Sequence, residues 1–294
     1  MRKAISPGAR LRNAVKSEKP LQVVGVINAY CARLAERAGF RALYLSGAGV
    51  ANASYGLPDL GFTMLRNVLE DVRRVTATTG LPLLVDADTG WENPERTARE
   101  MIRAGAGGMH LEDQVSAKRC GHRPGKKLVT AAEMVRRIRS AADGRTDRSF
   151  VIMARTDAAA NEGIEGAIER ARDYVAAGAE MIFAEALTSL EQYRRFTRAL
   201  RVPVLANVTE FGRTPLFTTK QLGSAGIRLA LYPLSAFRAI SAAAEKTYET
   251  IRKQGTQKSL LASMQTREEL YRVLDYHSYE KQANALLAKR KGKH

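Results

Sequence analysis

A short basic segment around a cysteine offers the clearest chemistry in this chain. Cys120 stands among the cations Lys118 and Arg119 and the imidazole of His122. Positive charge beside a thiol favours the thiolate, so we expect Cys120 to act as an acid/base group or a nucleophile rather than as a core residue. The acidic run Leu111–Gln114 precedes this segment and adds carboxylates that could hold a hard metal ion. Together they predict a reaction centre.

Three carboxylates have the spacing of a metal site. Asp86 and Asp88 are two residues apart, which places them on one face of a regular strand, and Glu112 follows a neighbouring apolar run. Ligands that are all oxygen suit Mg²⁺ or Mn²⁺ better than zinc, and Mg²⁺ usually keeps several waters. The alternative is that these groups cap helices or pair with buried arginines. We favour the metal site.

Several arginines indicate an anionic substrate. Arg155, Arg238 and Arg267 carry forked guanidinium groups that match carboxylates with two hydrogen bonds. Further hydrogen-bond donors are expected from Ser46, Gly47, Ala48, Asn207 and Thr209. A divalent cation beside several arginines predicts a substrate with two or three carboxylates. Phosphate is the rival anion, although the chain has no Walker-type loop.

Residues Ser116–Lys127 predict a lid over this centre. The segment is rich in lysine and arginine, contains Gly121 and Pro124, and has no hydrophobic periodicity. Such a segment after a strand could close over bound anions. An exposed basic loop is the simpler alternative, but an exposed thiol without a purpose is a liability.

Eight apolar runs alternate with helical patterns and must position these residues. Nearly continuous apolar character is typical of parallel strands that are covered on both faces. A strand followed by a helix, repeated eight times, predicts a (β/α)8 TIM-type barrel, with a doubly wound open sheet as the alternative. The predicted strands are Gln22–Ile27, Ala42–Leu45, Leu81–Val85, Gly108–Leu111, Phe150–Ala154, Met181–Ala184, Val202–Ala206 and Ile227–Leu231.

Helix boundaries are also readable between these runs. Asn93 before Pro94 is typical of a helix start, and Gly105 is placed to end that helix. Thr130–Glu133 and Thr188–Glu191 both fit the capping-box pattern.

Polar residues follow seven of the eight runs. In a barrel the reaction centre lies at the carboxyl ends of the strands, so these side chains should converge there. One polar strand exit is ordinary turn chemistry, but a repeated set predicts an active site. The set includes Ser46, Asp86, Asp88, Glu112, Arg155, Glu185, Asn207 and Thr209.

Composition favours one globular cytoplasmic domain. The chain has 294 residues, is 45% hydrophobic and contains only two cysteines, Cys31 and Cys120, which fits a reducing cytosol rather than a disulfide framework. It shows neither a signal peptide nor an apolar run long enough to span a bilayer. We predict a single barrel domain over 1–294, with C-terminal helices at about 240–287 and a basic tail at 288–294.

The net charge of +17 raises a nucleic-acid hypothesis. No zinc-finger spacing, aromatic RNA-binding motif or recognition helix accompanies it. A basic surface also steers polyanionic small molecules toward a site. We therefore expect no nucleic-acid and no membrane partner, with a non-catalytic nucleic-acid-binding barrel as the alternative from a different class.

Three motifs carry a resemblance to a known family. Lys118–Pro124 resembles the signature of the isocitrate lyase and phosphoenolpyruvate mutase superfamily. Ala230–Ala239 and Met264–Tyr271 are similar to its methylcitrate-cycle branch. The resemblance runs from about residue 5 to about residue 285, with the motifs in order. Ala48 departs from the pattern, which usually has glycine there.

The resemblance implies a carbon–carbon lyase. The expected reaction is reversible cleavage of 2-methylisocitrate to pyruvate and succinate in propionate catabolism, with isocitrate cleavage or oxaloacetate decarboxylation as alternatives within the superfamily. Asp86 and Asp88 would hold Mg²⁺ together with waters, with Glu112 in support. Cys120, beside Lys118 and His122, would protonate the carbon of the succinate half as general acid.

Further roles carry over from the resemblance residue by residue. Arg155 and Ser46–Ala48 would bind the pyruvate half. Tyr44 is the candidate base or its relay, with Asp59 as the competing choice. The remaining predicted substrate contacts, mainly to the succinate carboxylates, are Cys120, Gly121, His122, Glu185, Asn207, Thr209, Arg238 and Arg267.

The resemblance also implies a homotetramer in which C-terminal helices swap between subunits. Phe183, Leu231 and Pro233 lie at strand ends where a pocket for the substrate methyl group could form. Such a pocket favours the extra methyl by only about 1–3 kcal/mol, so some isocitrate cleavage should persist. Core packing is the alternative role for these three residues.

Overall fold

The structure is a computed structural model that describes residues 5–115 and 127–291. The chain divides into two compact units, Met1–Phe237 and Arg238–His294. The boundary falls close to the start of the predicted C-terminal helices, and each unit is described by itself. The prediction of a single domain stays a prediction.

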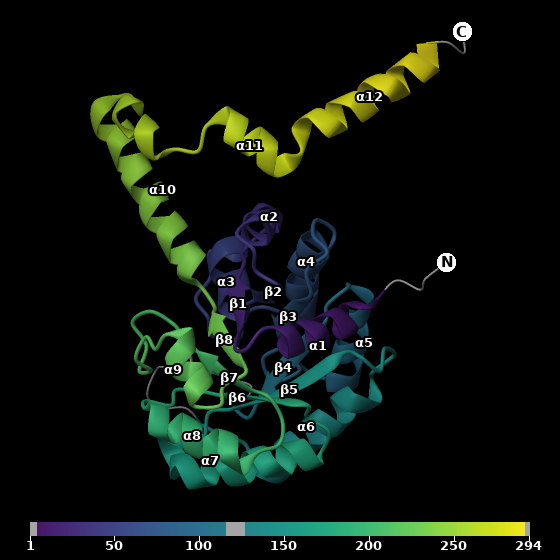
Figure 1. Ribbon diagram of the computed structural model, residues 1–294, viewed down its shortest axis with the longest axis vertical. Coiled ribbons are helices and arrows are strands. Elements are labelled where there is room, and N and C mark those ends of the chain that lie inside the picture. The colour runs from purple at the N-terminus through teal and green to yellow at the C-terminus, as the bar shows by residue number, and fades with distance from the viewer. Residues whose placement is uncertain (1–4, 116–126, 292–294) are drawn as a thin grey trace. The chain divides into compact units, whose positions relative to one another are not determined.

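The first unit contains a closed barrel of parallel strands, in which each strand pairs with its neighbours in chain order and β8 closes onto β1 (Figure 1). The predicted (β/α)8 barrel is therefore confirmed, and the open sheet is wrong. The strands are β1 Leu21–Gly25, β2 Ala42–Leu45, β3 Leu83–Asp86, β4 Gly108–Glu112, β5 Val151–Thr156, β6 Met181–Ala184, β7 Val204–Asn207 and β8 Leu229–Tyr232.

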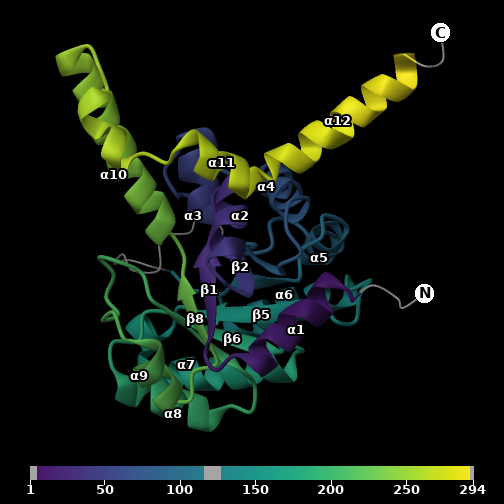
Figure 2. The same cartoon turned by 45° about the horizontal axis from the view of Figure 1, so that its top comes forward.

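Helices surround the strands of this barrel, as Figure 2 shows from a second direction. Most of the strands are followed by one covering helix. The helical elements up to the unit boundary are α1 Pro7–Ser17, α2 Ala29–Arg37, α3 Gly47–Gly49, η1 Val50–Ser54, α4 Leu65–Thr76, α5 Pro94–Arg103, α6 Ala131–Asp143, α7 Ala159–Ala176, α8 Leu190–Ala199 and α9 Thr219–Ser224.

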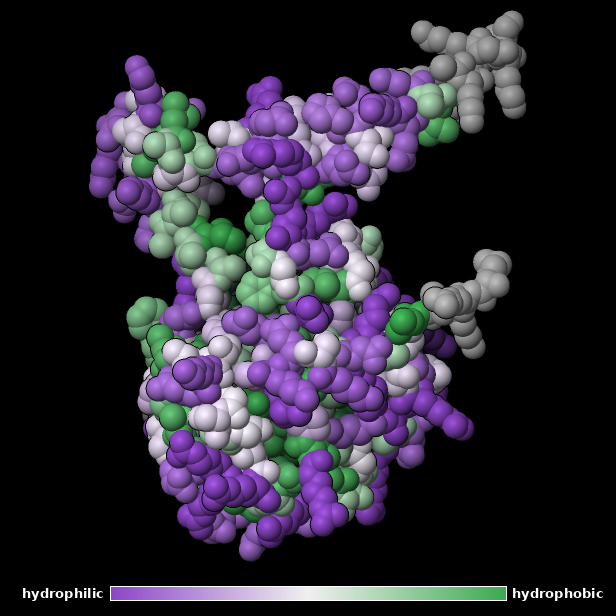
Figure 3. Space-filling view, viewed as in Figure 1, coloured by the Kyte–Doolittle hydropathy of each residue, from purple (hydrophilic) through white to green (hydrophobic). Residues whose placement is uncertain are grey.

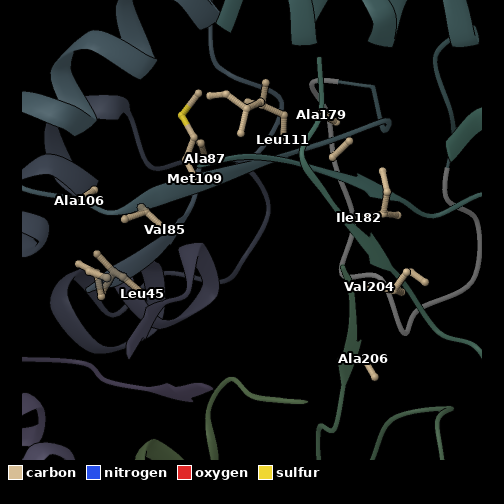
Figure 4. Close-up of a cluster of buried hydrophobic side chains, with 14 of the residues drawn as sticks. Leu45, Val85, Ala87, Ala106, Met109, Leu111, Ala179, Ile182, Val204 and Ala206 are labelled. Atoms are coloured by element: carbon tan, nitrogen blue, oxygen red, sulfur yellow. The ribbon is translucent and has the colours of Figure 1, made fainter. Parts of the chain in front are cut away.

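The core has two layers because successive strand residues point to opposite faces. On β2, Leu43 and Leu45 belong to the cluster packed between strands and helices, whereas Ala42 and Tyr44 belong to the cluster inside the barrel. Figure 4 shows part of the outer cluster, including Leu45 and Met109. This alternation decides which polar residues face the barrel interior.

Most strands end later than the sequence predicts. The ladder pairs Asp86 with His110 and Glu112 with Arg155, so these polar residues are still part of strands. Ladder hydrogen bonds use only the backbone, and a polar side chain at the open end of the barrel therefore does not end a strand. Because these strands are longer than predicted, the site residues at their ends follow the regular inward and outward alternation of strand side chains.

The helix boundary predictions are mostly confirmed. Asn93 caps α5 by accepting from the backbone N–H of Arg96, and Gly105 follows the end of that helix with φ +90°. Thr130 caps α6. The prediction for α8 is wrong by one residue, since Ser189 is the cap and Thr188 instead donates to the side chain of Gln192.

The second unit is helical, as predicted, and continues α10 (Ser235–Gln254), which begins in the first unit. It also contains η2 Lys258–Ser263, α11 Arg267–Leu274 and α12 Tyr276–Lys291. Helix α10 has no buried residue. Within the described ranges, no helix combines the length and apolarity needed to cross a membrane. Hydrophilic side chains cover much of the visible face of the barrel unit (Figure 3).

Candidate active site

Polar side chains fill the interior of the barrel at the carboxyl ends of its strands. Tyr44 points into the barrel on β2. By the same alternation, the last residues of β3, β4 and β7, which are Asp86, Glu112 and Asn207, also point into the barrel. Arg155 follows Met153 of the inner cluster by two residues on β5. All of these side chains are buried. The predicted convergence at this end of the barrel is confirmed for them.

Two of the predicted metal ligands meet beside Gly47. The backbone N–H of Gly47 donates to Asp86 Oδ2 over 3.1 Å, and the N–H of Asp88 donates to Asp86 Oδ1 over 3.1 Å. A Cβ added to Gly47 would lie 3.2 Å from both Asp86 Oδ2 and Asp88 Oδ1. The two carboxylates therefore converge on one point, and a side chain at residue 47 would crowd that point.

This donor set fits a magnesium ion. Its ligands are carboxylate oxygens, and Mg²⁺ commonly binds one or two carboxylates and completes its shell with water. Among the described residues no three acidic, histidine or cysteine side chains are arranged to hold a metal by themselves. The three carboxylates of Asp86, Asp88 and Glu112 are therefore not arranged to bind one ion directly. The arrangement suits an ion held by Asp86 and Asp88, with waters as its other ligands and Glu112 close by.

Arg155 lies among three carboxylates. Its Nε and Nη2 donate to the two oxygens of Asp157 over 2.9 and 3.2 Å. Its Nε also lies 3.4 Å from Glu112 Oε2, and its Nη2 lies 3.4 Å from Glu185 Oε2. Burial lowers the pKa of Arg155, but the charges of Asp157, Glu185 and Glu112 outweigh it and raise the pKa well above the ordinary value. The guanidinium is permanently charged.

The described part of this site carries an excess of negative charge. Besides the three partners of Arg155, the carboxylates of Asp86 and Asp88 are each only 6% exposed. Buried carboxylates are costly unless cations compensate them. Cations, as side chains or as a bound ion, are therefore expected to compensate this charge.

Tyr44 and His110 form a pair that the sequence reasoning half missed. Tyr44 Oη lies 2.9 Å from His110 Nε2, and the two rings are stacked with centroids 5.8 Å apart. His110 Nε2 lies 3.7 Å from Asp86 Oδ1. Burial, and then the charge of Asp86, raise the pKa of Tyr44 well above its usual value, so its hydroxyl keeps its proton. His110 precedes Glu112 by two residues on β4, and this spacing indicates that the two side chains lie on the same face of the strand.

Other predicted substrate residues line the same end of the barrel. Asn207 Nδ2 donates weakly to the Glu185 carboxylate, at 3.4 and 3.5 Å. Ser46 and Thr209 are buried, each 7% exposed. Phe183 belongs to the inner cluster and lies under Arg155, whose Cζ is 5.0 Å from the ring centroid. Phe183 therefore packs in the barrel interior directly beside the predicted anion-binding arginine.

The remaining predictions are not tested. Lys118, Cys120, Gly121, His122 and the predicted lid lie outside the described residues, apart from Lys127 at its end. Asp59 lies in the connection between η1 and α4 and is half-buried. Arg238 and Arg267 belong to the second unit, and their contacts with substrate stay predictions.

Comparison with known proteins shows the family to which the chain belongs. Residues 11–252 match the family model described as phosphoenolpyruvate phosphomutase. The chain is 58% identical to 2-methylisocitrate lyase of Escherichia coli (strain K12), over 97% of each chain. It is 57% identical to the Salmonella typhimurium enzyme of the same name, over 97% of this chain and 98% of that one.

Solved structures give the same result for the fold. A 2,3-dimethylmalate lyase, a member of the phosphoenolpyruvate mutase and isocitrate lyase superfamily, superposes with a TM-score of 0.88 at 33% identity, over 96% of both chains. A phosphonopyruvate hydrolase in complex with oxalate and Mg²⁺ superposes with a TM-score of 0.82 at 26% identity, over 96% of this chain and 98% of that one. The chain therefore belongs to the phosphoenolpyruvate phosphomutase family and, within it, to the branch of the 2-methylisocitrate lyases.

Proposed function

We propose that the protein is a Mg²⁺-dependent carbon–carbon lyase that cleaves 2-methylisocitrate to pyruvate and succinate. The observation that carries the proposal is the meeting of Asp86 and Asp88 beside Gly47, at the same end of the barrel as the buried guanidinium of Arg155. Similar members of the family are named 2-methylisocitrate lyase. A cation and a fixed arginine suit an enzyme that breaks a bond between carboxylated carbons, because both stabilise the negative charge that develops as the bond breaks.

Arg155 is the group we assign to the carboxylate of the pyruvate half. Its guanidinium is buried and held by Asp157 through two hydrogen bonds, so its direction is fixed before substrate arrives. Pre-orientation of this kind reduces the entropic cost of binding the substrate. We assign Ser46 and the backbone of Gly47 and Ala48 to the same half of the substrate, and Asn207, Thr209, Glu185 and Arg238 to the other half.

Asp86 and Asp88 would hold the magnesium ion with waters, and Glu112 would support them. A bound Mg²⁺ supplies a Lewis acid that polarises hydroxyl and carboxylate oxygens. Mn²⁺ has the same ligand preferences and is the alternative ion. Removal of the ion by a chelator should abolish turnover, and added Mg²⁺ should restore it.

Two protons must move in this reaction. The hydroxyl proton of the substrate leaves toward Tyr44, whose own hydroxyl contacts His110 Nε2 and can pass a proton on; Asp59 is the competing base. The electrons of the broken carbon–carbon bond remain on the succinate carbon. We assign its protonation to the thiol of Cys120, with Lys118 and His122 beside it in the sequence.

We further propose a place for the enzyme in propionate catabolism by the methylcitrate cycle, in the cytoplasm, as a homotetramer. Support for assembly comes from α10, which has no buried residue and exposes Ile240, Tyr248 and Ile251. Helix exchange between subunits would cover such a face. Light scattering at several protein concentrations tests it, and a monomer at all of them would contradict it.

The experiment that tests the activity measures pyruvate release from 2-methylisocitrate with Mg²⁺ and with chelator. The Cys120→Ser variant is the matched comparison, because it changes one atom of the proposed acid. We expect turnover that depends on Mg²⁺ and is lost in Cys120→Ser. A fully active Cys120→Ser enzyme would refute the acid role while leaving the reaction itself in place.

A further inference from the structure

A second cluster of buried polar groups lies outside the barrel wall, between β4, β5 and α7. It consists of Asp113, Thr156, Tyr174 and Arg170, with Glu162 at its edge. Asp113 follows Leu111 of the outer core cluster by two residues, so its carboxylate points away from the barrel interior. The reaction proposed above uses none of these groups.

The Asp113 carboxylate binds both neighbouring elements. Its Oδ2 accepts from the hydroxyls of Thr156 over 2.8 Å and of Tyr174 over 2.9 Å. Its Oδ1 accepts from the backbone N–H of Asp157 over 2.9 Å. Burial raises the pKa of Asp113, and the N–H and O–H donors around it oppose that rise.

Arg170 holds this cluster from the helix side. Its Nη1 donates to the carbonyl of Val129 over 2.9 Å, contacts Tyr174 Oη at 3.2 Å and lies 3.7 Å from Asp113 Oδ2. Its Nε and Nη2 each donate to a Glu162 oxygen over 2.7 Å. Val129 in turn donates its N–H to the carbonyl of Asp113 over 2.9 Å.

Gly163 makes the Arg170–Glu162 contact possible. Eight residues of a straight helix span about 12 Å along its axis, too far for a bidentate ion pair. Gly163 interrupts α7 with φ 74° and ψ −179°, which turns the first part of α7 back toward Arg170. Only glycine adopts this backbone conformation readily.

The cluster connects directly to the active-site arginine. Asp113 fixes the backbone of Asp157, and the Asp157 carboxylate fixes the Arg155 guanidinium through its two hydrogen bonds. We propose that Asp113 and Arg170 are positioning residues, which set the direction of Arg155 from outside the barrel through Asp157. This inference rests on the proposed function in one respect, the assignment of Arg155 to a substrate carboxylate.

The test compares Arg170→Met, Arg170→Lys and Arg195→Met in the full-length enzyme. Arg195 also pairs with α7, through Glu165, but contacts no member of the cluster and is the matched control. For Arg170→Met we expect KM for 2-methylisocitrate to rise about tenfold with kcat within about twofold, because a misdirected Arg155 loses binding shared by substrate and transition state. Arg170→Lys should recover part of that rise, and Arg195→Met should show none.

Hydrogen exchange at the amide of Asp157 gives a readout that does not depend on the reaction. Its N–H should exchange at least about tenfold faster in Arg170→Met than in Arg195→Met, because its acceptor is loosened. If Arg170→Met does not fold, Glu162→Gln removes only a partly exposed partner, and the same two changes should appear at smaller size. A lowered Tm with unchanged KM, or unchanged exchange at Asp157, overturns the proposal. A wild-type enzyme that fails to cleave the substrate refutes the proposed function instead, and the exchange measurement then still decides on the cluster.

Discussion

Replacement of Gly47 by alanine tests the proposed metal site with the smallest possible change. The added methyl group would lie 3.2 Å from Asp86 Oδ2, 3.2 Å from Asp88 Oδ1 and 3.4 Å from Asp86 Cγ. The first two distances are shorter than an ordinary van der Waals contact between carbon and oxygen. Asp86 is the last residue of β3 and cannot withdraw freely, so the carboxylates must separate by a few tenths of an ångström.

The size of the effect follows from what this movement loosens. The hydrogen bond from Gly47 N to Asp86 Oδ2, now 3.1 Å long, would lengthen. A hydrogen bond to a charged group contributes about 1.5–3 kcal/mol, and we expect roughly half of that, about 0.75–1.5 kcal/mol, to be lost from metal binding. That free energy corresponds to an Mg²⁺ affinity about 3.5- to 13-fold weaker.

Calorimetric titration with Mg²⁺, together with the Mg²⁺ dependence of the rate, measures this change. Gly49→Ala is the control, since its methyl group would meet Leu234 Cδ2 at 3.2 Å and Ser46 Cβ at 3.4 Å but no carboxylate. We expect weaker Mg²⁺ binding for Gly47→Ala and not for Gly49→Ala. Equal affinity in the wild type and in Gly47→Ala would refute the placement of the ion between Asp86 and Asp88.

Two further predictions concern stability. Gly163→Ala should lower the free energy of unfolding by about 1–3 kcal/mol through backbone strain alone, because no neighbouring atom lies within 4 Å of the added Cβ. Urea titration measures this loss, with Gly80→Ala as the control, since its added Cβ also has no neighbour within 4 Å. An equal loss of stability in the two variants would contradict the prediction. Burial, and then the charge of Glu185, raise the pKa of Tyr193 above the usual 10.0. The stability from its neutral hydroxyl is thus fully present below pH 10 and lost as the pH rises further. Between pH 9 and 11, Tyr193→Phe should lose about 1.4 kcal/mol less stability than the wild type; parallel pH curves would count against this.

The barrel was predictable because its signals are local and repeated. Apolar runs such as Ala42–Leu45 and Met181–Ala184 coincide with strands, since every residue of a buried parallel strand is covered on one side or the other. The convergence of Asp86, Glu112 and Arg155 then followed from topology, because a barrel brings all its strand ends to one rim.

Other parts of the site depend on contacts that no local pattern encodes. His110 lies within a run predicted only as a strand, and its role depends on contacts with Tyr44 and Asp86 from two other strands. The partners of Asp113 come from Thr156, Tyr174 and Arg170, between 43 and 61 residues away. Pairings of that kind arise only once β4, β5 and α7 have packed together.

The rate of succinate release from 2-methylisocitrate and from isocitrate at equal concentration, with Mg²⁺ present, tests the proposed reaction most directly. Both substrates yield succinate, so one assay compares them. We expect cleavage of 2-methylisocitrate with a kcat/KM higher by about 5- to 150-fold, the range that one buried methyl group supports, and residual cleavage of isocitrate. Faster cleavage of isocitrate, or no succinate from 2-methylisocitrate, would contradict it.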